Sequence, residues 1–333
     1  MIGRETLDRF ILEGQHAHPE ATGELSLLLM RIGVAGKRIA RELAIAGLKN
    51  THGAAGSSNV QGEEQKKLDV LANDILLETF DYGGLVSIAA SEELDEPFSY
   101  GATGAQGRYA VLFDPMDGSS NIDVNGALGT IFSIRQRREG SVRDLLRPGT
   151  EQIAAGYVLF GPAVLFVYSC GEGVHLFTLD PGIGEFLLTS RRVRTPAKGR
   201  GYAVNEGRSR AWAEPVRAFV DYLKEEDAGS GRPYATRYSG SMVADVHRIL
   251  LEGGIYLYPA DAGSAGKPGG KLRLLYECHP MAFVLEQAGG RASTGSERVL
   301  DLTPDALHAR TPFAIGSDTE IDWYETFERG GRP

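Results

Sequence analysis

The stretch that decides the fold is YAVLFDPMDGSSNID, residues 109–123, where an apolar run leads directly into two aspartates. The run YAVLF predicts a buried strand. Pro115 presets its own φ and favours a tight turn, so Asp114 and Asp117 can direct their carboxylates at one point. The stretch therefore predicts a metal site at the end of a strand.

Small residues follow the second aspartate and predict an anion site beside the carboxylates. Their backbone N–H groups are unhindered, and a helix starting here would direct them at a phosphate. The residues are Gly118, Ser119 and Ser120. A bare DPxD tetrapeptide favours a surface turn capped by aspartate, but the strand before it and the small residues after it favour a site.

Strands and helices alternate on both sides of this stretch. Helices are expected at 25–47, 67–80, 212–224, 242–254 and 280–289, and strands at 85–91, 109–113, 130–134, 154–160, 163–169, 202–205 and 255–258. The first helix follows a polar arm, and residues 51–65 suit a mobile loop. The class is α/β (mixed α+β), a layered α-β-α-β-α sandwich with two subdomains. The segment RRVRTPAKGRG separates an N-terminal domain, residues 1–194, from a C-terminal substrate-binding domain, residues 195–333.

Composition restricts the function classes. A chain of 333 residues, 42% hydrophobic and 24% charged, matches an ordinary globular protein. The net charge of -9, without long basic runs, argues against a nucleic-acid partner. Cys170 and Cys278 are too few for a disulfide framework, so a reducing cytoplasm is expected. No signal peptide and no membrane span are predicted.

Further carboxylates stand at the ends of other elements. Glu92 and Glu93 end the strand IAASEE and should point to opposite faces. We expect one to bridge metals and the other to hold a water; the alternative is that both are solvated strand-end charges. Glu277 lies just before a helix opened by Pro280, where it could equally be a first-turn partner of the helix dipole.

Two aspartates in KKLDVLANDIL cannot share one face of a regular helix. Asp69 and Asp74 are separated by about 140° around the axis. Either Asp69 belongs to the end of the loop, from which it could close on a bound metal, or one of the pair is a solvated charge, which the residues alone favour. Hard oxygen ligands without Cys or His clusters favour magnesium or manganese. Two such ions about 4 Å apart would support hydrolysis of a phosphate ester.

The whole chain resembles the class I fructose-1,6-bisphosphatases, within the lithium-sensitive phosphatase superfamily that includes inositol monophosphatase. The resemblance is carried, in order, by TGEL, KKLDVLAND, SEE, FDPMDGSSNID, GTIF, CGEGVH, NEG, RYSGSMVADVHR, GGIYLYPA and KLRLLYECHPMAFVLEQAGG. It implies hydrolysis of the 1-phosphate of fructose 1,6-bisphosphate by water, in gluconeogenesis or the Calvin cycle. It also implies two to three Mg²⁺ ions per subunit, with Mn²⁺ as an alternative.

The resemblance assigns roles to individual residues. The implied metal ligands are Glu92, Glu93, Asp114, the Met116 carbonyl, Asp117, Glu277 and, when the loop closes, Asp69. The implied catalytic residues are Asp74, which with Glu93 would deprotonate the water, and Asp69. The implied substrate ligands are Asp117, Gly118, Ser119, Ser120, Asn205, Arg208, Arg237, Tyr238, Gly240, Ser241, Met242, Tyr258 and Lys271.

Partners follow from the same resemblance. Arg237 matches an arginine that family members donate across a subunit interface, which implies a homotetramer built from dimers. The AMP inhibitor site of the family is matched in part, by Thr22, Gly23, Glu24, Ser26, Arg108 and Tyr109. Two departures stand out: Gln136 replaces a usual arginine of that site, and Arg208 replaces a tyrosine near the 6-phosphate.

Other interpretations remain open at this stage. Sedoheptulose 1,7-bisphosphate differs from the six-carbon substrate by one hydroxylated carbon, which changes a pocket only modestly. Inositol phosphates fit less well, because RYSGSM and KLRLLYE supply a distal phosphate pocket. A non-catalytic sensor of metal and sugar phosphate is the rival outside enzymes. Tyr238 and Tyr258 could be core aromatics, Asn205 a turn cap and Met242 helix core, and His247 is expected to be structural.

Overall fold

The structure is a computed structural model that describes residues 5–17, 21–49, 53–58, 64–81, 83–101, 107–260 and 269–333. Within these ranges the larger sheet has eight strands in the order β10-β9-β8-β7-β6-β5-β3-β4, and a second sheet has five in the order β12-β11-β13-β15-β14. The first sheet comprises β3 (Val86–Ser91), β4 (Phe98–Ser99), β5 (Tyr109–Asp117), β6 (Leu128–Gln136), β7 (Gln152–Phe160), β8 (Val164–Ser169), β9 (Val174–Asp180) and β10 (Glu185–Val193). The second comprises β11 (Gly201–Ala203), β12 (Ala235–Thr236), β13 (Ile255–Tyr258), β14 (Arg291–Ser293) and β15 (Phe313–Gly316).

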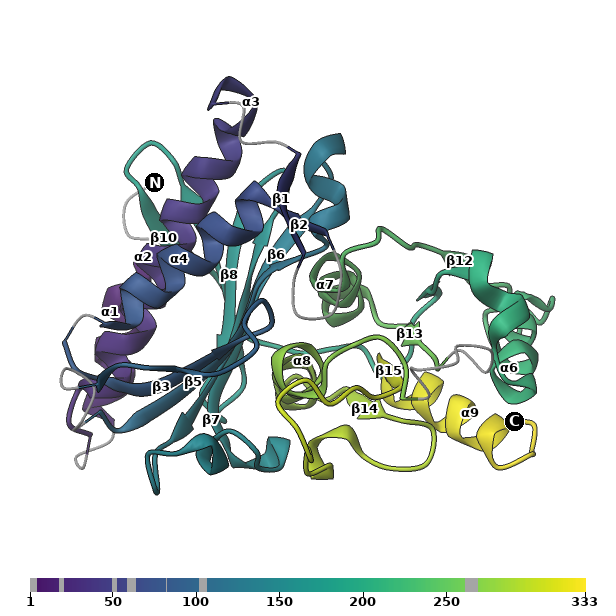
Figure 1. The fold of residues 1–333 in the computed structure, drawn as a ribbon. Helices are drawn as coiled ribbons and strands as arrows, with labels where there is room; N and C mark the ends of the chain where they lie inside the picture. Colours follow the sequence, from purple (N-terminus) through teal and green to yellow (C-terminus); the bar gives the residue numbers. More distant parts are fainter. Residues whose placement is uncertain are drawn as a thin grey trace.

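Helices form three layers around the two sheets (Figure 1). One face of the larger sheet is covered by α1 (Leu7–His16), α2 (Glu24–Ala44) and α4 (Lys67–Asp81), with α3 (Ala46–Lys49) following α2. Between the sheets lie α7 (Met242–Glu252) and α8 (His279–Gln287), and the outer face of the second sheet carries α6 (Glu214–Lys224) and α9 (Asp318–Glu328). The predicted α-β-α-β-α sandwich is confirmed.

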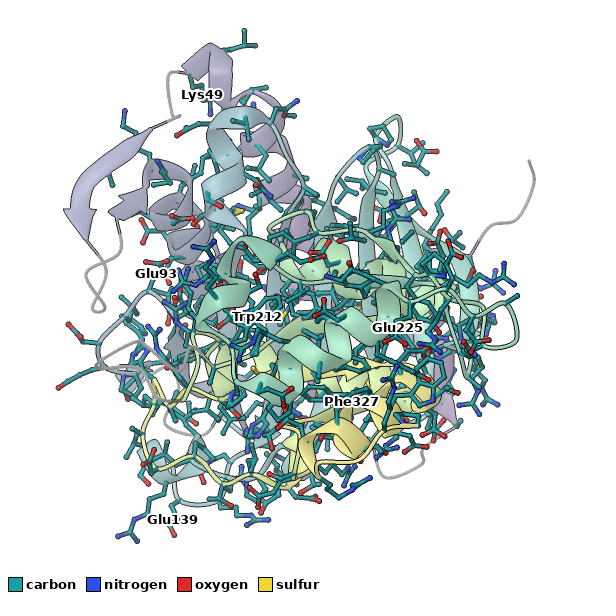
Figure 2. All side chains as sticks on the ribbon, turned by 90° about the vertical axis from the view of Figure 1, so that its right-hand side faces the viewer. Lys49, Glu93, Glu139, Trp212, Glu225 and Phe327 are labelled. Carbon is teal, nitrogen blue, oxygen red and sulfur yellow. The ribbon has the colours of Figure 1, made fainter. Side chains whose placement is uncertain are left out.

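The apolar periodicity of the sequence explains these layers. In α2, Leu28, Leu29, Ile32 and Ile39 recur at helical spacing and pack into the core beneath the larger sheet. The outer layer is aromatic: Trp212 and Phe327, both labelled in Figure 2, belong to the buried cluster between the second sheet and α6 and α9. The middle helices α7 and α8 contact strands of both sheets and are therefore buried on two sides.

Some expectations differ from the structure. The polar arm contains α1, because Leu7 and Ile11 give it a buried side. The expected loop at 51–65 includes two antiparallel strands, β1 (Ala54–Ser58) and β2 (Glu64–Lys66); residues 51–52 and 59–63 lie outside the described residues. Strand β5 runs through Pro115 to Asp117, with an irregular register between Asp114 and Asp117 in place of a tight turn.

Two further properties bear on the expectations from composition. In the described part of the chain, no helix combines the length and the apolar character that crossing a membrane requires. Cys170 is exposed and Cys278 is buried, and neither forms a disulfide.

Candidate functional site

Three buried carboxylates meet at the junction between the larger sheet and the middle helices. Asp114 and Asp117 come from the end of β5, and Glu277 comes from the π-helix η5 (Leu274–Cys278) that runs into α8. One oxygen of each lies within 4.8 Å of one oxygen of the others. Glu277 is 160 residues from Asp117 in the sequence, and the fold brings the two side chains together. This agrees with the expectation that both belong to one acidic site.

The N-terminus of helix α7 holds the Asp117 carboxylate in place. The Ser241 hydroxyl and the Val243 N–H donate to one carboxylate oxygen at 2.6 and 2.9 Å, and the Met242 N–H donates to the other at 3.2 Å. The carboxylate thus satisfies free N–H groups of the helix and faces its positive dipole end. Gly118 has φ +77°, and a Cβ there would lie 2.8 Å from the Ser241 Cβ, so glycine permits this close approach.

A buried arginine balances the charge of the cluster. The Arg273 guanidinium forms an ion pair with Glu92, which directly follows β3, and one of its nitrogens lies 4.0 Å from Glu277. All three side chains are at most 7% exposed. The backbone N–H of Arg273 also donates to the Glu277 carboxylate. One guanidinium therefore lies beside two carboxylates, and the cluster of Asp114, Asp117, Glu277 and Glu92 keeps a net negative charge when its carboxyl groups are ionised.

Burial and this negative charge raise the pKa values of three carboxyl groups in the cluster. Burial raises the pKa of Asp114 well above its ordinary value, and the charges of Glu92, Glu277 and Asp117 raise it further. Burial raises the pKa of Glu277 to about 7 against the lowering effect of Arg273. Burial also raises the pKa of Asp117, although its hydrogen bonds from the start of α7 oppose the shift. Converging carboxylates that repel one another at neutral pH are suited to a hard divalent cation.

Asp69 and Asp74 lie in different environments on α4. Asp69 is 2% exposed, accepts a hydrogen bond from the Lys66 N–H at 2.8 Å, and has a second oxygen without a hydrogen-bond partner among the described residues. Burial raises its pKa to about 7, and the Glu92 charge contributes to the rise. Asp74 is exposed. The expectation that one of the pair is a solvated charge is met by Asp74, so the geometry does not support a catalytic role for it.

Asp123 attaches the β1–β2 hairpin next to this site. Its carboxylate accepts from the Gly53 N–H at 2.9 Å and pairs with the Lys66 ammonium at 3.1 Å. It belongs to the 3-10 helix η1 (Ser119–Val124), which begins with the residues predicted to bind phosphate. Gly118 and Ser119 are half-buried and Ser120 is exposed, so a ligand can reach their N–H groups. Glu93, directly after Glu92, is half-buried.

A group of tyrosines adjoins the acidic cluster. Tyr238 bonds to the Asn205 side chain, and the Asp117 charge helps to raise its pKa. Tyr256, fully buried in β13, has Tyr238, Tyr258 and Asp117 as electrostatic neighbours, and its ring centroid lies 6.5 Å from that of Tyr258. Tyr238 as a whole is 38% exposed. Asn205, Tyr238 and Tyr258 are thus brought to one place beside the carboxylates.

The other predicted substrate ligands include three exposed cations and one buried methionine. Arg208 and Lys271 are exposed, and Arg237 is exposed and donates to its neighbour's carbonyl, that of Thr236, at 2.8 Å. Met242 has 2% of its surface exposed and packs in the middle core, so its side chain follows the core interpretation and only its N–H faces Asp117. Gly240 is half-buried beside the Asn121 side chain. His247 is buried and bonded to the Tyr157 hydroxyl at 2.9 Å, as a structural histidine would be.

A separate cavity of about 700 Å³ lies between α1, α2 and the strands β8 to β10. Its lining includes Thr22, Gly23, Ser26, Arg108 and Tyr109. Glu24 pairs with Arg108 at 3.2 Å at its margin. All six residues that resemble the AMP site of the family therefore lie at one place. Gln136 is exposed and pairs with Tyr109 across β5 and β6.

Sequence reasoning missed several residues of the site. Arg273 lies within the quoted segment KLRLLYE, and its position four residues before Glu277 was a readable signal for a pair on a helix. Tyr256 and Asp123 gave no such signal, because their roles depend on the sheet pairing of β13 and on the hairpin that docks against η1.

Comparison with known proteins agrees with this geometry. Residues 5–191 match the family model "Fructose-1-6-bisphosphatase, N-terminal domain", and residues 195–329 match the C-terminal domain of the same family. A class 1 fructose-1,6-bisphosphatase of Chlorobium luteolum is 50% identical over 332 residues, covering 98% of each chain. The class 1 enzyme of Thermosynechococcus vestitus is 47% identical over 97% of this chain and 92% of its own.

Solved structures give the same relationship. The holo form of Leishmania major fructose-1,6-bisphosphatase superposes with a TM-score of 0.91 at 38% identity, covering 98% of this chain and 99% of that chain. Its apo form gives a TM-score of 0.86 at 37% identity, covering 98% and 100%.

Proposed function

Because this chain belongs to the class 1 fructose-1,6-bisphosphatase family, we propose that it hydrolyses fructose 1,6-bisphosphate to fructose 6-phosphate and inorganic phosphate. Water attacks the 1-phosphorus, the bond from phosphorus to the ester oxygen breaks, and that oxygen takes up a proton. The observation that carries the proposal is the convergence of Asp114, Asp117 and Glu277. The reaction is a step of gluconeogenesis and of the Calvin cycle, and both fit the chlorobial and cyanobacterial relatives.

The acidic cluster is the proposed binding site for two to three Mg²⁺ ions, with Mn²⁺ as the alternative. The donors are hard oxygens, and within the described ranges no His or Cys belongs to the group, which fits these ions. Bound there, the cations supply charge stabilisation for the phosphoryl group and lower the pKa of water. The proposed ligands are Asp114, Asp117, Glu277, Glu92, Glu93 and the Met116 carbonyl.

Asp69, with Glu93, is the proposed acceptor of the water proton, in place of Asp74. It is buried next to Glu92 and has one carboxylate oxygen with no hydrogen bond from the described residues. Its pKa, raised to about 7, suits a base at neutral pH. A role as metal ligand in a closed state is the alternative for the same carboxylate.

The two phosphates would occupy opposite ends of the site. The N–H groups of Gly118, Ser119 and Ser120 suit the 1-phosphate. Asn205, Tyr238 and Tyr258 suit the 6-phosphate, with Lys271 and Arg208 as cations and Gly240, Ser241 and the Met242 N–H beside the sugar.

The exposed Arg237 suits donation to a neighbouring subunit. The protein would then be a homotetramer, and each subunit would consist of two domains, residues 1–194 and 195–333. A cytoplasmic location remains a prediction.

The test is phosphate release from purified protein with and without Mg²⁺. We expect release from fructose 1,6-bisphosphate that stops when the metal is chelated. Parallel assays with sedoheptulose 1,7-bisphosphate and inositol 1-phosphate measure kcat/KM for the rival substrates. Bound substrate without any phosphate release would instead establish a sensor, and a kcat/KM higher for the seven-carbon bisphosphate would make that the substrate.

The cavity lined by Thr22, Ser26 and Arg108 is the proposed AMP site. We expect AMP to raise the Tm and to lower the rate, and Arg108→Ala to weaken both effects about tenfold, because a charged hydrogen bond is worth roughly 1.5–3 kcal/mol. Arg38→Ala is the matched control: Arg38 is an exposed arginine on α2, paired with Glu78. An unchanged Tm and rate at saturating AMP would exclude this effector.

A further inference from the structure

A fully buried arginine in the larger sheet forms no ion pair with a carboxylate among the described residues, although the charge of Glu151 acts on it from a distance. Arg135, on β6, has 0% of its surface exposed, and its guanidinium donates to the carbonyls of Arg147 and Pro148 at 2.7 and 2.9 Å. Burial lowers its pKa to about 9, at which it is still charged at neutral pH. A buried charge without a direct ion pair is costly, so the hydrogen-bond partners of this guanidinium matter for the structure around it.

The remaining contact is with His279. The second terminal nitrogen of Arg135 lies 3.3 Å from the His279 Nδ1. An arginine nitrogen can only donate, so Nδ1 carries the lone pair and the imidazole is fixed in one tautomer. The His279 carbonyl accepts from the Gln152 side chain at 3.0 Å. A Cβ on Gly149 would lie 2.8 Å from the ring, so glycine admits the imidazole. His279 is therefore held by its ring and by its backbone.

His279 also ends the turn that carries Glu277. Its N–H donates to the Leu274 carbonyl, five residues earlier, and the Cys278 N–H donates to the Arg273 carbonyl at 3.1 Å in the same pattern. These bonds define the π-helix, whose wider turn changes the direction of the side chains it carries. Such single π-turns cost stability and recur at functional sites. Here the widened turn directs Glu277 at Asp114 and Asp117.

We propose that Arg135 and His279 are positioning residues for Glu277. The Arg135 guanidinium, which is bonded to the loop carbonyls, fixes the His279 imidazole. The imidazole and the backbone carbonyl of His279 together fix the end of the π-turn. The turn places the Glu277 carboxylate opposite the two aspartates. Further hydrogen bonds hold the same loop between β6 and β7: Asp144 accepts from the N–H groups of residues 138–140 at 2.6–3.2 Å. The inference rests on the proposed function, since it assigns Glu277 to the metal.

The experiment measures the dissociation constant of Mn²⁺ alone by calorimetry, together with the Tm of the metal-free protein. His279→Leu removes the ring acceptor, and we expect about tenfold weaker Mn²⁺ binding, in the range found for groups that orient metal ligands. Arg135→Lys keeps the charge but not the fork that spans carbonyl and imidazole, so a loss of about threefold is expected. The double variant should lose no more than His279→Leu alone, because both act through one contact. Excess Mn²⁺ should restore kcat.

The matched control is Tyr234→Phe, which removes a buried hydrogen bond to Glu320 at the second sheet. It should lower the Tm and leave Mn²⁺ binding unchanged. A His279→Leu protein with a lowered Tm but unaltered Mn²⁺ affinity would overturn the proposal and leave a purely structural pair. If that variant does not fold, Gln152→Met, which removes only the bonds to His279 and Gly149, takes its place under the same criterion. Glu277→Gln separates the two hypotheses: unchanged Mn²⁺ affinity there would refute the metal assignment itself.

Discussion

Asp114→Asn is expected to abolish turnover, by roughly a thousandfold or more, and at the same time to stabilise the metal-free protein at about pH 8. The loss of turnover follows from the removal of one of three converging carboxylates. The gain in stability follows from the removal of a buried charge that burial, Glu92, Glu277 and Asp117 all disfavour. Asparagine keeps the oxygen that accepts the Met116 N–H at 2.9 Å, so the local backbone is preserved.

The sign of the pH dependence follows from the direction of the shift. A carboxyl whose pKa is higher in the folded than in the unfolded state binds more protons when folded, so stability falls as pH rises through that window. With the pKa of Glu277 at about 7 and that of Asp114 raised well above its ordinary value, the metal-free protein should lose stability from about pH 4 to above pH 7. The Asp114→Asn increase in Tm, about 2 °C, should therefore be present at about pH 8 and absent at about pH 4.

Asp117→Ala is the matched comparison, because it also removes a carboxylate from the cluster. It should abolish turnover as well, but it should lower the Tm at every pH, since Asp117 accepts three hydrogen bonds from the start of α7. The measurements are calorimetric Tm values in a chelator and phosphate release at saturating Mg²⁺. Full activity in either variant would refute the metal assignment. An equal change in Tm at about pH 4 and about pH 8 in Asp114→Asn would refute the repulsion between the carboxylates of the cluster.

The sequence predicts the layers well because apolar periodicity survives in the folded state. Helices at 67–80 and 212–224 appear as α4 and α6 within a few residues, and the hairpin across residues 161 and 162 forms as β7 and β8. Strands β9 and β10 were not predicted, and neither was α9. Their apolar residues are interrupted by polar or charged ones, and only pairing with neighbouring strands or packing against α6 gives each of them a buried side.

The site was predictable where its residues are adjacent in sequence and less so where the fold joins distant segments. The DPMDG segment holds, within five consecutive residues, two carboxylates and the start of the turn proposed to bind phosphate, so local chemistry suffices to predict them. The Arg135–His279 pair spans 144 residues, and nothing in either segment indicates the other. The choice between Asp69 and Asp74 was open for the same reason: helical spacing shows that they diverge, but only the packing of α4 shows which one is buried.

Asp69→Asn is expected to lower kcat at saturating Mg²⁺ by about a hundredfold or more, which is the usual contribution of a positioned general base. Asp74→Asn is its matched control, five residues along the same helix, and should leave kcat within about twofold and stability within about 0.5 kcal/mol, because its side chain is exposed. The amide at position 69 can still accept the Lys66 N–H, so the start of α4 should persist and the Tm should not fall. A pH profile adds a second readout: the acidic limb of kcat, near the Asp69 pKa of about 7, should disappear in Asp69→Asn and remain in Asp74→Asn. The reverse result, with activity lost only in Asp74→Asn, would return the proton-accepting role to the exposed carboxylate and would require a rearrangement of α4 when substrate binds.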